Sequence, residues 1–137
     1  DRLALVQGVK NGLIDVIVSD HLPEDEESKR LPFAQAATGA IGVETLLPLS
    51  LEMYHNESLP LNKIIETLTV NPSKILKINK GSLAKGSDGD ICIFDLEAPW
   101  AVQADKLKSK SKNTAIEGRK LQGKVLMTFL NGELVFN

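Results

Sequence analysis

The sequence has few of the residues that build self-contained metal or disulfide sites. Its 137 residues include one cysteine, Cys92, and two histidines, His21 and His55. A single cysteine excludes an internal disulfide and suits a reducing compartment. Two histidines are too few for a multi-histidine metal centre built within this chain.

The sequence also lacks a charge excess and a long apolar run. Lys+Arg number 16 against Asp+Glu 18, so the formal net charge is -2, and aromatic residues make up 4%. We therefore expect no nucleic-acid partner. No apolar run approaches the ~20 residues that span a bilayer, and no signal-peptide pattern is present, so we expect a cytoplasmic protein without membrane contact. The chain begins at Asp1 rather than Met, and it is too short for a (β/α)₈ barrel of about 250 residues, so we expect part of a longer polypeptide.

The first part of the chain has an α/β pattern. Residues 1–12 are expected to form a helix, with Asn11-Gly12 as its stop. Residues 13–18 are rich in β-branched residues and apolar except for Asp15, which predicts a strand buried on both faces. Helical spacing predicts two more helices, one after Thr45 as N-cap and one over residues 61–68. A further short helix is expected with Asn71 as N-cap and Pro72 at its first position.

From Gly81 onward the pattern changes to strands and turns. Residues 91–94 are strand-like, and Cys92 among them is expected to be a small core residue. Asn131-Gly132 separates two strand-like runs, residues 124–130 and 133–136, which predicts a hairpin. Residues 106–113 form a polar loop with four lysines, most simply a solvated connection.

Asp20 is the residue whose position suggests chemistry. It directly follows the expected strand, and α/β folds place their active sites at the carboxyl ends of strands. The alternative is that Asp20 only caps the following turn, and position alone leaves both readings open. His21 can orient a carboxylate or donate a hydrogen bond to a ligand, whereas His55 is expected at a helix end, where it favours the helix dipole.

Several segments resemble class I bacterial-type dihydroorotases, in the cyclic-amide branch of the amidohydrolase superfamily. Residues 18–23, Val-Ser-Asp-His-Leu-Pro, resemble the strand-eight segment of that superfamily. The other similar segments, in the family's order, are residues 29–36, 39–49, 71–74, 86–91, 94–95 and 109–114. The resemblance covers the whole chain and corresponds to the carboxyl-terminal third of such an enzyme. Gly42-Val43-Glu44-Thr45 favours dihydroorotases over other cyclic amidases.

The resemblance implies an α/β fold, the C-terminal end of a metal-dependent-hydrolase (β/α)₈ TIM barrel plus part of a small β-sandwich domain. Residues 1–80 would supply the last strand and helices of the barrel, and residues 81–137 the C-terminal part of the β-sandwich. The implied reaction is zinc-dependent, reversible hydrolysis of the cyclic amide of (S)-dihydroorotate to N-carbamoyl-L-aspartate in pyrimidine biosynthesis. The other metal ligands of the family lie on earlier strands, so this fragment is expected to be inactive alone.

The resemblance also implies roles for five residues. Asp20 would contact one or two zinc ions and move a proton to the amide nitrogen, with His21 orienting it. Glu24 stands where many relatives have a histidine that binds the substrate carboxylate, and its negative charge would repel that group. Phe33 and Ala34 would contact the substrate through their backbone, although relatives often have glycine at Ala34.

Two alternatives remain beside this enzyme. One is a non-catalytic dihydroorotase-like subunit that supports aspartate carbamoyltransferase, and the other is a different cyclic amidase, a hydantoinase or allantoinase. The expected partners are the small-molecule substrate, the remainder of the chain's own barrel, and either a homo-oligomer or aspartate carbamoyltransferase.

Overall fold

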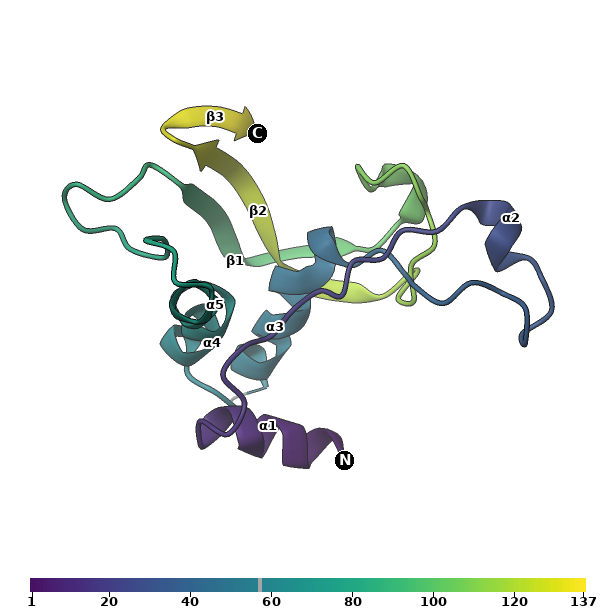
Figure 1. Ribbon diagram of the computed structural model, residues 1–137, viewed down its shortest axis with the longest axis horizontal. Coiled ribbons are helices and arrows are strands. Elements are labelled where there is room, and N and C mark those ends of the chain that lie inside the picture. Colours follow the sequence, from purple (N-terminus) through teal and green to yellow (C-terminus); the bar gives the residue numbers. More distant parts are fainter. Residues whose placement is uncertain (57) are drawn as a thin grey trace.

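A computed structural model describes residues 1–56 and 58–137, in which helices precede an antiparallel sheet (Figure 1). The helices are α1 (Arg2–Lys10), α2 (Glu26–Lys29), the 3₁₀ turn η1 (Val43–Thr45), α3 (Leu46–His55), α4 (Leu61–Leu68), α5 (Val70–Leu76) and the 3₁₀ turn η2 (Ala104–Lys106). The strands are β1 (Ile91–Ala101), β2 (Lys120–Leu130) and β3 (Glu133–Phe136).

The longer helices follow the sequence pattern. α1 is followed by Gly12 at φ 72°, a left-handed conformation that glycine adopts without strain. α3 begins after Thr45, and Pro48 is buried in its first turn, where no intrahelical amide donor is lost. Ile64 on α4 is fully buried and packs in one small core with Val9 of α1. The predicted helices over these segments are confirmed.

The boundary of α5 differs from the prediction. Thr69, not Asn71, precedes its first residue, so Pro72 occupies the third helical position. The side chain of Asn71 instead donates from Nδ2 to the carbonyl of Asp15, 2.9 Å away. A long-range hydrogen bond thus replaces the expected cap and ties α5 to the extended segment before Asp20.

The three strands form an antiparallel sheet in the order β1-β2-β3. The hairpin at Asn131-Gly132 is confirmed, with both residues at positive φ (51° and 83°), as a tight turn of this kind requires. The β1–β2 pairing has a bulge between Asp95 and Pro99, where the Asp95 side chain accepts hydrogen bonds from the amides of Glu97 and Ala98. The Asp95 carboxylate thus satisfies two backbone donors within the bulge.

α3 packs on β2 and joins the helices to the sheet. Leu51 of α3 is fully buried, and its Cδ1 atom would lie 2.5 Å from a Cβ atom placed on Gly123, so the absence of a side chain on β2 permits this contact. Glu52 of α3 forms an ion pair with Arg119, with Nη2 2.6 and 2.9 Å from the two carboxylate oxygens. A small core then continues this interface, formed by Ile41, Val102, Leu107 and Leu121.

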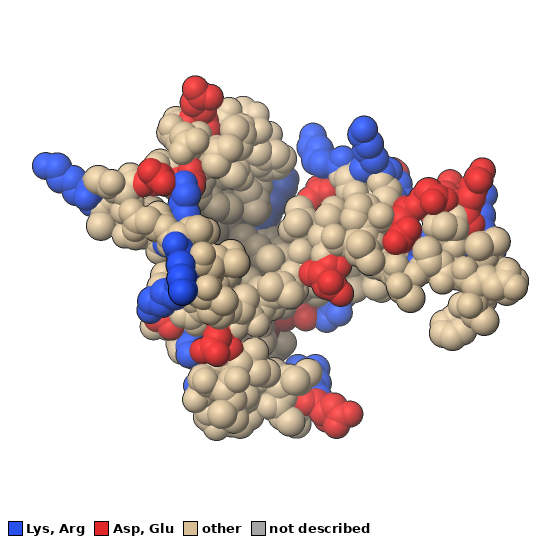
Figure 2. All heavy atoms as spheres, in the orientation of Figure 1, with Lys and Arg blue, Asp and Glu red and all other residues tan. Residues whose placement is uncertain are grey.

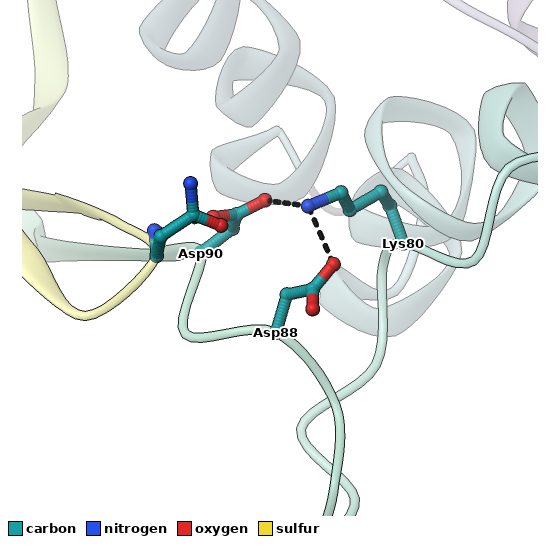
Figure 3. Close-up of polar contacts among 4 residues, drawn as sticks. Lys80, Asp88 and Asp90 are labelled. Atoms are coloured by element: carbon teal, nitrogen blue, oxygen red, sulfur yellow. Dashed lines mark hydrogen bonds and ion pairs between the residues drawn. The ribbon is translucent and has the colours of Figure 1, made fainter.

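A second link connects the segment after α5 to the hairpin turn (Figure 3). Lys80 Nζ lies 2.7 Å from Asp88 Oδ2 and 2.6 Å from Asp90 Oδ2. The other carboxylate oxygen of Asp90 accepts the Asn131 amide at 2.8 Å. The Asn131 hydrogen bond and the Lys80 ammonium lower the pKa of Asp90, and the two carboxylates raise the pKa of Lys80.

Two features of the described residues differ from what the sequence pattern predicts. Residues 13–18 are extended but form no strand, because a strand needs a hydrogen-bonded neighbour along its edge and none of the described residues supplies one. Val18 is consequently 71% exposed. Cys92 is exposed on β1 rather than buried in a core, although partial burial of its thiol raises the pKa of that group.

The change from helices to strands falls between Leu76 and Ile91. The division into domains at residues 80 and 81 stays a prediction. None of the helices in the described part of the chain has the length and apolar character that crossing a membrane requires.

Candidate functional site

Asp20 lies at the end of the extended segment and lines a hollow of about 420 Å³. Its φ is 46°, in the left-handed region that aspartate tolerates better than most residues. The hollow is lined by residues 17–20, by residues 39–42, by one side of α3 as far as Met53, and by residues 114–116. The sharp backbone turn at Asp20 therefore occurs where two segments separated by about twenty residues come together.

Residues 39–43, the return segment, run beside residues 19–22. His21 and Ala40 form a parallel bridge, and the Leu22 amide donates to the Ala40 carbonyl at 3.0 Å. A Cβ atom on Gly42 would lie 2.7 Å from the Ser19 carbonyl oxygen, and one on Gly39 would lie equally close to the Leu22 carbonyl oxygen. The two glycines thus allow an approach that no other residue would permit without displacement.

The His21 side chain is held by the return segment. Its Nδ1 atom accepts hydrogen bonds from the amides of Gly42 at 3.0 Å and Val43 at 3.3 Å. Because an accepting Nδ1 carries no proton, the neutral imidazole has its proton on Nε2. The expected role of His21 in orienting Asp20 stays a prediction, and its observed partners are backbone amides.

A loop from the sheet region, residues 106–113, makes hydrogen bonds to residues within or next to both segments. We name it the lysine-rich loop. The carboxylate of Glu44 accepts the amides of Lys108 and Ser109 at 2.9 and 3.0 Å, and Asn113 donates from Nδ2 to the Gly39 carbonyl at 2.8 Å. Ser111 Oγ donates to the Glu24 carbonyl at 2.7 Å. The sequence singled out the segment around Glu44 and the lysine-rich loop, but it did not predict that they contact each other. The two lie more than sixty positions apart, and local patterns do not connect such distant residues.

The remaining predicted site residues do not line the hollow with Asp20. Glu24 is half-buried, whereas Phe33 is 100% exposed and Ala34 is exposed, on the loop that projects beside α2 (Figure 1). Asp25 caps α2 by accepting the Ser28 amide at 2.7 Å, which lowers the pKa of Asp25. Of the five predicted site residues, only Asp20 therefore lines the hollow, and His21, the next residue in the chain, faces the amides of the return segment.

Charge is distributed unevenly near the site. Figure 2 shows acidic side chains gathered over α2 and basic side chains over the neighbouring lysine-rich loop.

The described side chains do not by themselves fit a metal ion, because no group of three or more His, Cys, Asp or Glu among them is placed to hold one. Asp20 offers one carboxylate, which is a single ligand of the three or four that a zinc site uses.

The comparison with known families places the chain in one of them. Residues 1–135 match the Amidohydrolase family, and the chain belongs to that family. The fold class expected from the sequence, α/β with the end of an amidohydrolase barrel, is confirmed, and the described residues of the expected β-sandwich part form one three-stranded antiparallel sheet. Membership of this family implies a metal cofactor.

Within this family, the chain is similar to dihydroorotases in sequence and to hydantoinases in structure. The chain is 44% identical over 136 residues to a dihydroorotase of Ehrlichia chaffeensis, covering 99% of this chain and 30% of that protein. It is 42% identical over 136 residues to a dihydroorotase of Aquifex aeolicus, covering 99% of this chain and 32% of that protein. A solved L-hydantoinase (dihydropyrimidinase) from Arthrobacter aurescens superposes with a TM-score of 0.88 at 32% identity, covering 97% of this chain and 31% of that one. The chain thus spans about 30% of the length of the relatives it matches.

Proposed function

We propose that this chain is the C-terminal part of a dihydroorotase, which reversibly hydrolyses the cyclic amide of (S)-dihydroorotate to N-carbamoyl-L-aspartate. The observation that carries the proposal is the 42–44% identity to proteins of that name along nearly the whole chain. Hydantoinases share the fold, but the sequence is more similar to dihydroorotases, 44% against 32% for the L-hydantoinase.

Asp20 is the residue of this chain that we propose for the chemistry. Hydrolysis requires a water molecule to lose a proton as it attacks the amide carbonyl, and the ring nitrogen to gain a proton as the C–N bond breaks. A carboxylate within reach of both atoms can accept the first proton and donate the second. The position of Asp20 at the edge of the hollow suits this role, and the reverse reaction uses the same two transfers.

The other parts of the proposal concern the whole protein. We propose Zn²⁺, one or two ions, as the metal, with Asp20 as this chain's ligand and the remaining ligands supplied by the rest of the barrel. The backbone of Phe33 and Ala34 would contact substrate only once that barrel surrounds them, and Glu24 would lie beside the substrate with its carboxylate turned away from the substrate's own. A cytoplasmic location and assembly as a homo-oligomer, or with aspartate carbamoyltransferase, complete the proposal.

A substrate panel tests this function. The protein to use is the intact polypeptide, meaning the longest chain that contains residues 1–137, purified and supplied with zinc. We expect turnover of dihydroorotate and carbamoyl-aspartate to exceed turnover of hydantoin, dihydrouracil and allantoin by at least about 10²-fold in kcat/KM, about 3 kcal/mol of transition-state discrimination.

Each other outcome of the panel has a distinct meaning. A preference for hydantoin or allantoin would replace the proposed substrate with another cyclic amide. No turnover of any of them, by a folded protein with metal bound, would contradict the enzyme and favour the non-catalytic subunit. The isolated 137-residue chain is the negative control, and it should be inactive because it carries only one proposed metal ligand.

A further inference from the structure

The carboxylate of Glu44 connects the segment at residues 42–45 to the lysine-rich loop. The proposed chemistry gives neither of these segments a role. Glu44 lies in the 3₁₀ turn η1, directly after the return segment, and is half-buried. Its two oxygens each accept one backbone amide of the lysine-rich loop, from Lys108 at 2.9 Å and Ser109 at 3.0 Å. A carboxylate that accepts two amides holds a loop more firmly than a neutral side chain, because hydrogen bonds to a charged acceptor are roughly twice as strong.

The lysine-rich loop, once held by Glu44, contacts both sides of the Asp20 turn. Asn113 donates through Nδ2 to the Gly39 carbonyl, and its own carbonyl accepts the Ile41 amide at 2.9 Å. On the other side, Ser111 Oγ donates to the carbonyl of Glu24, four residues after Asp20. The loop therefore makes hydrogen bonds to Gly39 and Ile41, which line the hollow, and to Glu24, which lies just beyond the Asp20 turn.

The return segment transmits this restraint to His21. The amides of Gly42 and Val43, which donate to His21 Nδ1, lie immediately before Glu44 in the chain. A displacement of Glu44 moves these two donors, and with them the residue adjacent to Asp20. The left-handed backbone of Asp20 adds to the need for outside support, because such a conformation persists only where surrounding contacts hold it.

We propose that Glu44 is a positioning residue, which sets the placement of Asp20 and His21 by fastening the lysine-rich loop across the residue 19–24 and 39–43 segments. This inference rests on the proposed function for its kinetic readout. If Glu44 has this role, the proposed activity depends on the lysine-rich loop of the sheet region as well as on the helical part of the chain that carries Asp20.

The test compares Glu44→Gln with the matched control Glu52→Gln in the intact polypeptide. Glu52 also joins the helices to the sheet region, through its ion pair with Arg119, but it contacts neither the return segment nor the lysine-rich loop. If a substitution only weakens the contact between the helices and the sheet region, both variants should therefore lose activity to the same extent. Only Glu44→Gln should disturb Asp20.

We expect Glu44→Gln to lower kcat by about 10²-fold with KM changed less than threefold, as a misplaced catalytic group does. Glu52→Gln should keep both constants near wild type even where its Tm falls as much. The double variant Glu44→Gln/Asn113→Ala should lose little more than the larger single loss, since both changes release the same loop. Equal kcat values for Glu44→Gln and Glu52→Gln, or a rise in KM alone, would overturn the proposal.

A second measurement separates this inference from the proposed function. Amide hydrogen exchange at Gly42 and Val43 should become at least tenfold faster in Glu44→Gln than in Glu52→Gln, whatever substrate the protein uses. Unchanged exchange overturns the positioning role. If the wild-type protein turns over no cyclic amide, the proposed function fails, and exchange alone then decides whether Glu44 holds the return segment.

Discussion

The β1–β2 pair and the segment from residue 13 to 20 are both extended and rich in apolar residues, yet only the first forms a sheet. β1 and β2 pair from Ile91 with Phe129 to Ala101 with Lys120. The earlier segment makes isolated hydrogen bonds instead, such as the one from the Ile17 amide to the Thr67 carbonyl at 3.2 Å. The difference teaches that a β-branched run predicts extended backbone, whereas a strand also requires a partner.

The two regions also differ in what covers their side chains. Val102, next to β1, is fully buried in the core with Leu107 and Leu121, whereas Val18 is 71% exposed. The proposed remainder of the barrel would cover Val18 and pair the backbone beside it. Burial at Val18 is thus the property that distinguishes an exposed connection from a barrel strand.

The largest expected effect comes from truncating these two valines in the intact polypeptide. Val102→Ala should lower the free energy of unfolding by about 2 kcal/mol, through lost burial of two methyl groups and the cavity that remains. If residues 13–18 pair as a barrel strand there, Val18→Ala should cost a similar amount. Denaturant unfolding measures both. A neutral Val18→Ala beside a destabilising Val102→Ala would show that the segment remains exposed and would contradict the barrel assignment.

An intermediate effect is expected where the return segment approaches the Asp20 turn. Gly39→Ala places a Cβ atom 2.7 Å from the Leu22 carbonyl oxygen, whereas Gly86→Ala meets nothing within 4 Å. Both glycines have positive φ, at 132° and 91°, so both substitutions carry backbone strain. We expect Gly39→Ala to cost roughly 1–2 kcal/mol more than Gly86→Ala, because backbone has to move. Equal losses of Tm in the two variants would show that the two segments do not lie this close in solution.

The smallest expected effect is a pH dependence in the sheet region. The Asn131 amide and Lys80 lower the pKa of Asp90 below its ordinary value of 3.8. This contribution to stability is present above pH 3.8 and is lost as the pH falls through the lower, folded-state pKa. The Tm difference between wild type and Asp90→Asn should therefore be positive at neutral pH and shrink as the pH falls below 3.8. Asp105→Asn, at an exposed position, is the control, and a gap that widens in acid would contradict the assignment.

Much of the fold follows from local sequence patterns. Helical spacing located α1, α3 and α4, and Asn131-Gly132 located the hairpin, because these features depend on residues close in the chain. The start of α5 was misplaced because Asn71 bonds to Asp15, a partner that no local rule identifies. Cys92 was expected in a core because alternation marks two faces of a strand but not which one is covered.

The candidate site was predictable in part. Asp20 follows from its place after an apolar run, and the structure puts it at the edge of a hollow. The hydrogen bonds from the lysine-rich loop to Glu44 and Gly39 could not be predicted, since they join residues more than sixty positions apart. Glu24, Phe33 and Ala34 stay predictions, because the surfaces they would face lie outside the described residues.

The central claim, that Asp20 is the proton-transferring residue of a cyclic amidase, is tested most directly by Asp20→Asn in the intact polypeptide. Asparagine tolerates the left-handed backbone of this position as well as aspartate does, so the Tm should stay near wild type. We expect kcat for dihydroorotate to fall by about 10²–10⁴-fold, the usual contribution of a general acid–base group, while Asp15→Asn on the same segment stays near wild type. An Asp20→Asn variant that retains more than a tenth of wild-type kcat would contradict the account.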